Sequence, residues 1–187
     1  MGLVLIAAPA VEPISLADLK ARLSIDHDLA DSLLTTLIAA ARAAVERMTR
    51  RPMTTQTLRY TLDRAPPGGL VRLPVAPVQT VSAVRVADAT GALIPWPGAL
   101  QLDLAGEPAR LLFAGAVPLP GVPIGGIEID IVAGYGPTAD AVPEPLRQAV
   151  AMLAAHWYAN RGDAPSGPVP DEVTALTAGF RLLRLAA

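Results

Sequence analysis

Residues 31–52 read DSLLTTLIAAARAAVERMTRRP, and this stretch decides the fold of the first part of the chain. Its apolar residues, together with Leu29 just before it, recur at steps of three and four as far as Met48, which is the spacing of one helix face. Acidic residues precede the run and arginines close it, as the helix dipole favours, and Pro52 stops it. The stretch predicts a long amphipathic helix whose alanines let a neighbour approach closely.

Two further helices are predicted on either side of the middle of the chain. The first runs from Ser15 to about Leu23, because Ser15 can cap its first turn and Asp18, three residues later, lies near the positive end of the dipole. The second is long and begins at residues 143–145, Pro-Glu-Pro, where proline and an acid suit a first helical turn. Its apolar stripe extends from Leu146 to Trp157.

Between the long helices the pattern changes to strict alternation. Residues 100–104 read LQLDL and residues 127–131 read IEIDI, which is typical of strands with one buried and one solvated face. The connections are too short for crossover helices, which excludes a doubly wound α/β fold and favours antiparallel sheet. The predicted fold class is α+β, a helical scaffold with a C-terminal arm and an inserted antiparallel β region. Residues 13–53 and 137–187 are assigned to the scaffold and residues 54–136 to the insertion.

The composition indicates a folded protein and excludes several classes of site. Of 187 residues, 52% are hydrophobic and 17% are charged, so disorder of the whole chain is not expected. Cysteine is absent, which excludes disulfides and thiolate metal sites, and the net charge of −2 argues against a dedicated DNA-binding protein. The apolar run at residues 3–8 is too short for a signal peptide, and no window approaches a membrane span. We expect a protein made and used without export.

The sequence offers no arrangement of residues suited to catalysis. His27 stands between Asp26 and Asp28, but neighbouring residues at a helix start point in different directions, so a solvated helix start with capping carboxylates is favoured over a metal site. His156 is interpreted as a structural residue of the late helix. Motifs of hydrolases, phosphate-binding loops and zinc proteases are absent. No catalytic, cofactor-binding or metal-binding residue is therefore predicted, and an enzyme using His27 and His156 is kept only as a rival hypothesis.

Two groups of residues are candidates for contacts with other molecules. Three arginines, Arg47, Arg50 and Arg51, crowd the end of the long helix; the dipole accounts for them, and contact with a neighbouring subunit or with DNA is the functional alternative. The C-terminal segment predicts either a core helix or an arm that docks into another protein. The residues assigned to this docking arm are Leu176, Phe180, Arg181, Leu182, Leu183, Arg184 and Leu185.

Several stretches together resemble the head–tail connector (adaptor) proteins of tailed phages. Residues 13–23, PISLADLKARL, with residues 28–51 after them, resemble the N-terminal part of that family. Residues 142–150, VPEPLRQAV, and residues 156–161, HWYANR, look like its late helix, and residues 169–181 are similar to its C-terminal segment. The β-rich middle resembles a larger subgroup that has sheet between the long helices.

The resemblance implies a structural subunit rather than an enzyme. It implies a homo-oligomeric ring, commonly of twelve subunits, under the portal of a tailed phage or a phage-like gene-transfer particle. The implied partners are the portal protein and head-closure or tail proteins; packaged DNA would pass through without sequence-specific binding, and no cofactor or membrane is involved. The expected location is the head–tail junction of the particle, after assembly in the bacterial cytoplasm. The alternative hypothesis makes the β-rich region a binding module for a tail protein, a capsid protein or a glycan.

Overall fold

The computed structural model describes residues 2–160 and 169–182, which form two compact units. One, called here the β unit, comprises Met1–Pro9 and Thr55–Tyr135; the other, the helical unit, comprises Ala10–Thr54 and Gly136–Ala187. Both helices and antiparallel strands are present, so the predicted α+β class is confirmed.

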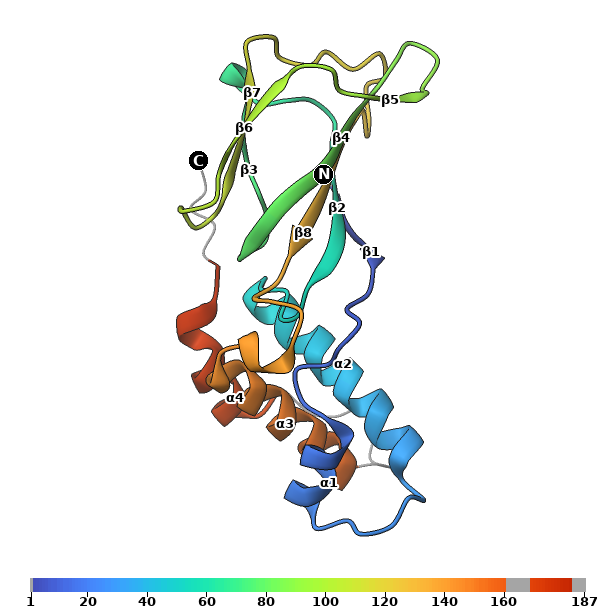
Figure 1. Ribbon diagram of the computed structural model, residues 1–187, viewed down its shortest axis with the longest axis vertical. Coiled ribbons are helices and arrows are strands. Elements are labelled where there is room, and N and C mark those ends of the chain that lie inside the picture. Colours follow the sequence, from blue (N-terminus) through green and yellow to red (C-terminus); the bar gives the residue numbers. More distant parts are fainter. Residues whose placement is uncertain (1, 161–168, 183–187) are drawn as a thin grey trace. The chain divides into compact units, whose positions relative to one another are not determined.

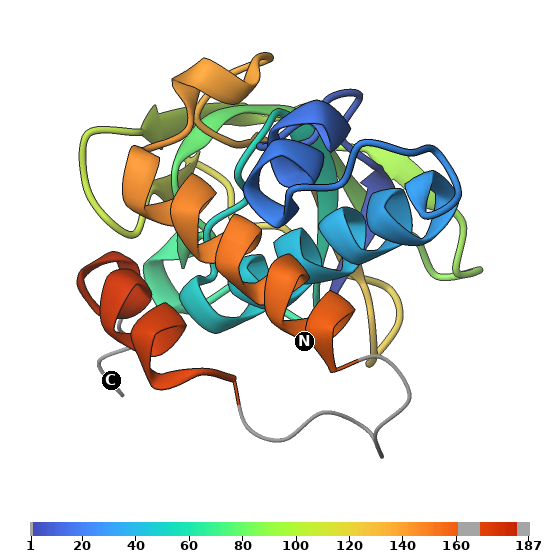
Figure 2. The same ribbon diagram turned by 90° about the horizontal axis from the view of Figure 1, so that it is seen from below.

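The helical unit contains four α-helices in its described part. Figure 2 shows α3 beside α2, with α4 on the other side of α3. Apolar residues of α2, among them Leu34 and Ile38, are buried, as are Leu146 and Leu153 of α3. The helices are α1 (Leu16–Leu23), α2 (Asp31–Thr49), α3 (Glu144–Ala159) and α4 (Asp171–Thr177), with short 3₁₀ turns at Ala139–Ala141 and Ala178–Phe180.

Local signals explain the start of α1 but only partly that of α2. The Ser15 hydroxyl accepts a hydrogen bond from the Asp18 N–H at 3.0 Å, and the Ser15 N–H donates to the Asp18 carboxylate, forming a capping box. The hydrogen bond from the Ser15 hydroxyl lowers the pKa of Asp18. In contrast, α2 has no side-chain cap, because its N-cap residue is Ala30, whose methyl group cannot accept a hydrogen bond. Asp28, before it, accepts a hydrogen bond from Lys20 at 2.7 Å. Leu29, expected in the apolar stripe, precedes the helix and is 94% exposed.

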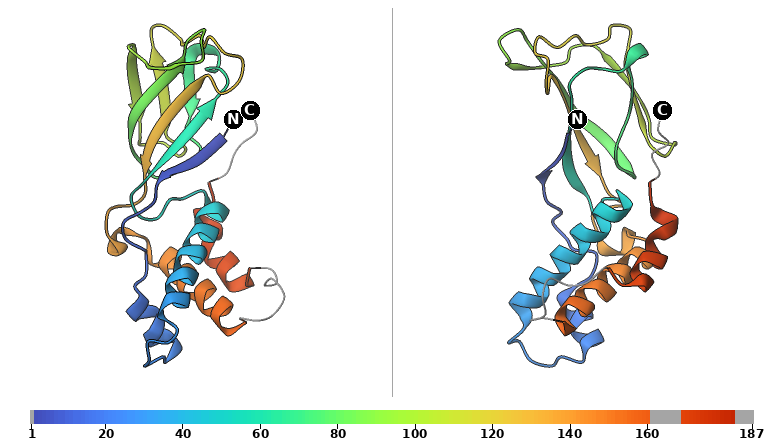
Figure 3. Two further views of the ribbon diagram at one scale, coloured as in Figure 1. Left: turned by 90° about the vertical axis from the view of Figure 1, so that its right-hand side faces the viewer. Right: turned by 180° about the vertical axis from the view of Figure 1, so that it is seen from behind.

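The β unit consists of two antiparallel sheets that appear as separate layers in Figures 1 and 3. One sheet has five strands in the order β1-β2-β8-β4-β5, and the other has three in the order β3-β7-β6. The strands are β1 (Gly2–Ala7), β2 (Gln56–Leu62), β3 (Leu70–Arg72), β4 (Val78–Ala87), β5 (Leu93–Pro95), β6 (Ala99–Asp103), β7 (Arg110–Ala114) and β8 (Ile127–Ala133).

The core of the β unit lies between its two sheets. The alternation seen in residues 127–131 places Ile127, Ile129 and Ile131 in that core, where all three are fully buried. The smaller sheet contributes Leu111 and Phe113 to the same cluster. Strand β1 was not predicted: the apolar run near the N-terminus pairs with β2 and so extends the sheet that the middle of the chain forms.

Candidate functional site

The last described residues lie against the C-terminal end of α2. The guanidinium of Arg51 donates through Nε to the Phe180 carbonyl at 2.6 Å. Two residues further on, the Leu182 N–H donates to the Thr49 carbonyl at 3.0 Å. These two bonds fix residues 178–182, called here the arm root, to the corner that follows α2.

A buried ionic network stiffens the same corner. Arg42, only 8% exposed, donates through Nε to Glu12 at 2.7 Å and through a terminal nitrogen to Glu46 at 2.9 Å. The other oxygen of Glu46 accepts the Met53 N–H at 2.8 Å, which holds the chain where it leaves the helix. Burial of Arg42 disfavours its charge, but the hydrogen bond to Glu12 and the charge of Glu46 outweigh it, so the pKa of Arg42 is raised. The arm root therefore starts from a rigid support.

The three arginines at the end of α2 do not form one patch. Arg47 and Arg50 are exposed, and Arg50 has a left-handed backbone with φ of 57° that ends the helix. Arg51 is buried and engages the arm root of its own chain. Contacts of Arg47, Arg50 and Arg51 with a neighbouring subunit or with DNA stay predictions; for Arg51 such a contact would compete with an intramolecular role.

The C-terminal segment begins as a core helix, one of the two roles that the sequence left open; the docking role stays a prediction. Val173 and Thr177 of α4 have no exposed surface. Beyond α4 follow the 3₁₀ turn at Ala178–Phe180 and Arg181, whose backbone is extended. Of the predicted arm residues, Leu176, Phe180 and Leu182 are partly buried and Arg181 is exposed, whereas Leu183, Arg184 and Leu185 lie outside the described residues.

In the β unit, four charged side chains form a cluster on the sheet face opposite the core. Arg59 donates through Nε to Asp130 at 2.7 Å, and Arg85 donates to the other oxygen of Asp130 at 2.9 Å. Arg59 also lies 3.1 Å from the carboxylate of Glu128. The hydrogen bond to Asp130 raises the pKa of Arg59. The register explains the cluster, because Arg59 stands opposite Asp130 and Arg85 stands opposite Glu128. It joins β2, β8 and β4 through paired opposite charges.

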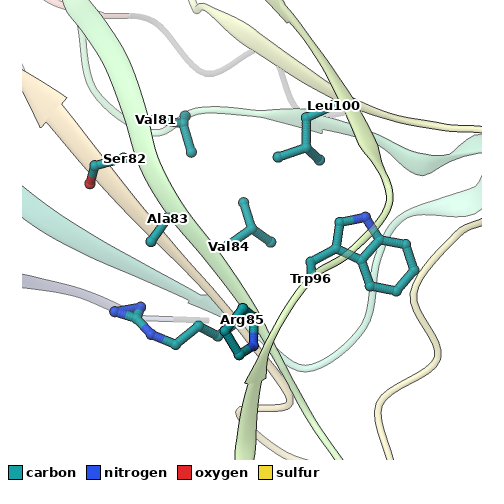
Figure 4. A pocket seen from close by; sticks show the side chains of 8 residues that line it. Val81, Ser82, Ala83, Val84, Arg85, Trp96 and Leu100 are labelled. Carbon is teal, nitrogen blue, oxygen red and sulfur yellow. The ribbon is translucent and has the colours of Figure 1, made fainter.

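A shallow hollow of about 380 Å³ lies beside β4, with Trp96 and Leu100 on its rim (Figure 4). Trp96 packs edge-on against Phe113, with ring centroids 5.8 Å apart, and its buried Nε1 has no hydrogen-bond partner among the described residues. Arg85, the one charged residue of the lining, is already bound to Asp130. The indole nitrogen is covered, so the hollow offers chiefly the side chains of β4, Trp96 and Leu100. The hypothesis of a binding module stays a prediction.

The two histidines are far apart in the sequence and in different surroundings. His27 is exposed in the loop before α2, and His156 is half-buried in α3 with its Nδ1 at 3.3 Å from the Asn160 amide. Within residues 2–160 and 169–182, no three side chains of the metal-binding types gather. None of the described helices is both long and apolar enough to cross a bilayer.

These features define a class of protein: a helical unit combined with a unit of two packed antiparallel sheets. The profile of the phage gp6-like head-tail connector protein family matches residues 13–88. Among curated protein sequences, none matches the chain.

Solved structures of gene transfer agent (GTA) particles match the whole chain. A chain in the neck of an empty GTA particle computed with C6 symmetry is 33% identical, with a TM-score of 0.84, and the alignment covers 100% of this chain and 98% of that one. A chain in the neck of a native GTA particle computed with C12 symmetry is also 33% identical over the same shares of both chains, with a TM-score of 0.80. A chain in the virion of the native GTA particle is 32% identical over those shares, with a TM-score of 0.79.

The chain therefore belongs to the head–tail connector family and is a structural subunit of a head–tail junction. The resemblance that the sequence suggested is confirmed, and so is the predicted location in a phage-like particle. Sequence reasoning missed the buried Arg42 network and the inward turn of Arg51, because neither has a periodic pattern. The one local signal for the network is the spacing of Arg42 and Glu46, which stand four residues apart on α2 and form an ion pair at 2.9 Å.

Proposed function

We propose that the chain forms a homo-oligomeric ring, of twelve subunits, that joins the portal to head-closure or tail proteins around the DNA channel. The observation that carries the proposal is the full-length match to neck structures computed with C6 and C12 symmetry. Rotational symmetry about the particle axis is the arrangement expected of identical subunits around a channel. In this role the subunit catalyses nothing, which agrees with its membership of a structural family.

The segment that follows the arm root is the proposed contact with the portal. The arm root is held by the bonds to Arg51 and Thr49, so residues 183–187 leave from a defined point on the helical unit. Their sequence, LRLAA, is apolar apart from one arginine, a composition suited to burial in a groove of another protein. A fixed root lowers the entropy lost when the segment binds.

The packaged DNA is proposed to pass through the ring without being read. The chain has a net charge of −2, and a dedicated DNA-binding surface would show a basic excess. Arg47 and Arg50 are exposed and face solvent or a neighbouring subunit, where they offer salt-sensitive contacts with phosphate or carboxylate groups.

Sedimentation of the purified chain, alone and mixed with the portal ring of the same particle, tests the proposal. We expect a discrete large complex in the mixture, and negative-stain images of that complex should show a ring with the symmetry of the portal axis. A chain that forms no ring alone and no complex with the portal would overturn the proposal.

The docking arm has its own test, a chain that ends at Leu182. This truncation keeps the bonds of the arm root and all of α4, whereas a deletion from Asp171 onward would also remove the fully buried Val173. We expect the truncated chain to lose the portal complex while the fluorescence of Trp157 in α3 stays unchanged. The matched control is Glu172→Gln, an exposed substitution on α4 that leaves the arm intact. Portal binding by the truncated chain at the full-length level would contradict the arm.

A further inference from the structure

Strand β1 is an edge strand with unusual surroundings. It pairs with β2 on one side only, and it forms one end of the five-stranded sheet. Four consecutive large apolar side chains, Leu3, Val4, Leu5 and Ile6, are exposed at 43%, 58%, 46% and 48%. No charged residue occurs between residues 2 and 11. Folded proteins normally protect such an edge with charges, prolines or a cover, so this edge is suited to pairing with another strand.

The opposite end of the same sheet is also open. It is formed by β5, whose Leu93 and Ile94 are exposed at 40% and 51%. The surrounding residues 89–102 carry no charge either. Both ends of the sheet are therefore apolar and uncharged. They differ in one respect, since Pro95 leaves β5 without an N–H donor at its last position.

A ring requires two different surfaces to meet at every subunit contact. In rotational symmetry above two-fold, the interface is head-to-tail, so one face of each copy contacts a different face of the next. A sheet with two open, unlike edges supplies such a pair of surfaces. Resting on the ring proposed above, we infer that β1 of one copy pairs with β5 of the neighbouring copy, so that a second copy of this chain covers each edge and the sheet continues from subunit to subunit.

The register within one copy fixes which residues would meet. Leu3 and Leu5 stand opposite Tyr60 and Leu58 of β2, so they lie on the core-facing side of the sheet. Val4 stands opposite Arg59 and lies on the other side.

On the far edge, Ile94 stands opposite Val86, which stands opposite the buried Ile127, so Ile94 is also on the core-facing side. Because successive residues of a strand point to opposite faces, a continuous sheet brings Ile94 near Leu3 or Leu5 and keeps it away from Val4.

Disulfide trapping tests this pairing cleanly, because the chain has no cysteine of its own. The double variants Leu3→Cys with Ile94→Cys and Leu5→Cys with Ile94→Cys are assembled on the portal and oxidised. A disulfide requires Cα atoms within about 7 Å, which facing residues of adjacent strands satisfy. Within one copy, four strand spacings separate the two edges by about 19 Å, so any bond formed joins two copies.

We expect at least one of these variants to give a ladder of dimers, trimers and larger species on a non-reducing gel. The matched control, Val4→Cys with Ile94→Cys, should give no ladder, since its cysteines lie on opposite faces. Each single variant should stay monomeric on the gel. The fluorescence of Trp96 checks that every variant keeps its β unit folded.

Any of the following results would overturn the inference. A Val4 ladder equal to those of Leu3 and Leu5 would mean contact without sheet pairing. Dimers from Leu5→Cys alone would mean that β1 pairs with β1 of another copy, and a bond from Leu5→Cys to a cysteine placed in the portal would mean that the portal supplies the strand. Absence of every cross-link in rings seen by electron microscopy would refute the pairing alone, whereas absence of rings and of portal complexes would refute the proposed function with it.

Discussion

The helical unit buries charged groups, whereas the β unit exposes apolar ones. In the helical unit, Arg42 and Arg51 are almost inaccessible and each is bonded inside its own chain. Most of the exposed large apolar side chains belong to the β unit, on β1, on β5 and in the segment between β7 and β8. Exposed apolar surface on that scale marks contact with other molecules. The β unit therefore has more surface suited to contact with neighbours than the helical unit has.

The largest effect is expected where the helical unit buries charge. Arg42→Ala removes both bonds of the guanidinium and leaves Glu12 and Glu46 facing each other with little solvent. Breaking a buried ion pair by removing one partner costs about 3 kcal/mol of unfolding free energy. Urea unfolding followed by Trp157 fluorescence, in a Trp96→Phe background, measures this loss in the helical unit.

Arg47→Ala is the matched control for that experiment, since it lies on the same helix and is exposed. It should change the unfolding free energy by no more than about 0.5 kcal/mol. Equal losses of unfolding free energy for Arg42→Ala and Arg47→Ala would contradict a stabilising role of the Arg42 network. In a Trp157→Phe background, the same two variants also test whether residues 54–136 form a separate inserted domain, because then Arg42→Ala should leave the unfolding transition reported by Trp96 unchanged.

A smaller loss is expected in the β unit from Asp130→Ala. This carboxylate accepts from Arg59 at 2.7 Å and from Arg85 at 2.9 Å, so its removal leaves two guanidinium groups side by side. Hydrogen bonds to charged groups contribute about 2 kcal/mol each, and the flanking Glu128 offsets part of the loss. We expect a net destabilisation of about 2 kcal/mol, measured by the Trp96 signal in a Trp157→Phe background.

Asp103→Ala provides the comparison within the same unit. Its pair with Arg110 is exposed, and solvent screening makes the contribution of such a pair to stability small. The hydrogen bond from Arg110 lowers the pKa of Asp103, so any contribution is present at neutral pH and is lost as the pH falls through that lowered pKa. If Asp103→Ala lowers the unfolding free energy as much as Asp130→Ala does, burial of the Asp130 carboxylate is not the reason that the charged cluster stabilises the β unit.

The sequence predicted the helical unit far better than the β unit. Helix periodicity, the capping box at Ser15 and the proline at the corner are local signals, and they placed α1, α2 and α3 within a few residues. The start of α2 was harder, because its N-cap residue, Ala30, gives no capping signal. Strands with strict alternation, such as β6 and β8, were also predicted from their pattern.

The sequence did not predict strands β1, β5 and β7. For β1 and β5 the physical reasons differ. β1 is apolar on both faces, so it has no alternation, and its partner β2 begins about fifty residues later in the chain. β5 has only three residues, of which one is proline. The arm root was unforeseen because a bond such as that from Arg51 to Phe180 joins groups 129 residues apart and leaves no trace in local sequence. Long-range pairing is what single-sequence patterns do not contain.

The smallest effect on stability is expected in the segment between β7 and β8. This segment also tests most directly whether the exposed apolar residues of the β unit serve contact with other molecules. Leu119 and Ile124 are exposed at 90% and 80% there. The segment is nevertheless fixed, since the Gly121 N–H donates to the Ala87 carbonyl at 2.9 Å and the Gly125 N–H donates to Asp63 at 2.9 Å. Apolar side chains held outward by a fixed backbone contribute little to the fold and are available to a partner.

The double variant Leu119→Ser and Ile124→Ser should therefore leave the unfolding free energy within about 0.5 kcal/mol of the parent. If the β unit is a binding module in the particle, the same variant should reduce attachment of the next neck component, measured as the fraction of filled heads that carry tails. The control is Gln101→Ser, another exposed substitution in the β unit that removes no apolar surface. If particles with the double variant carry tails at the normal frequency, this segment is not part of the contact surface. The edges formed by β1 and β5 would then be the remaining candidates for contacts made by the β unit.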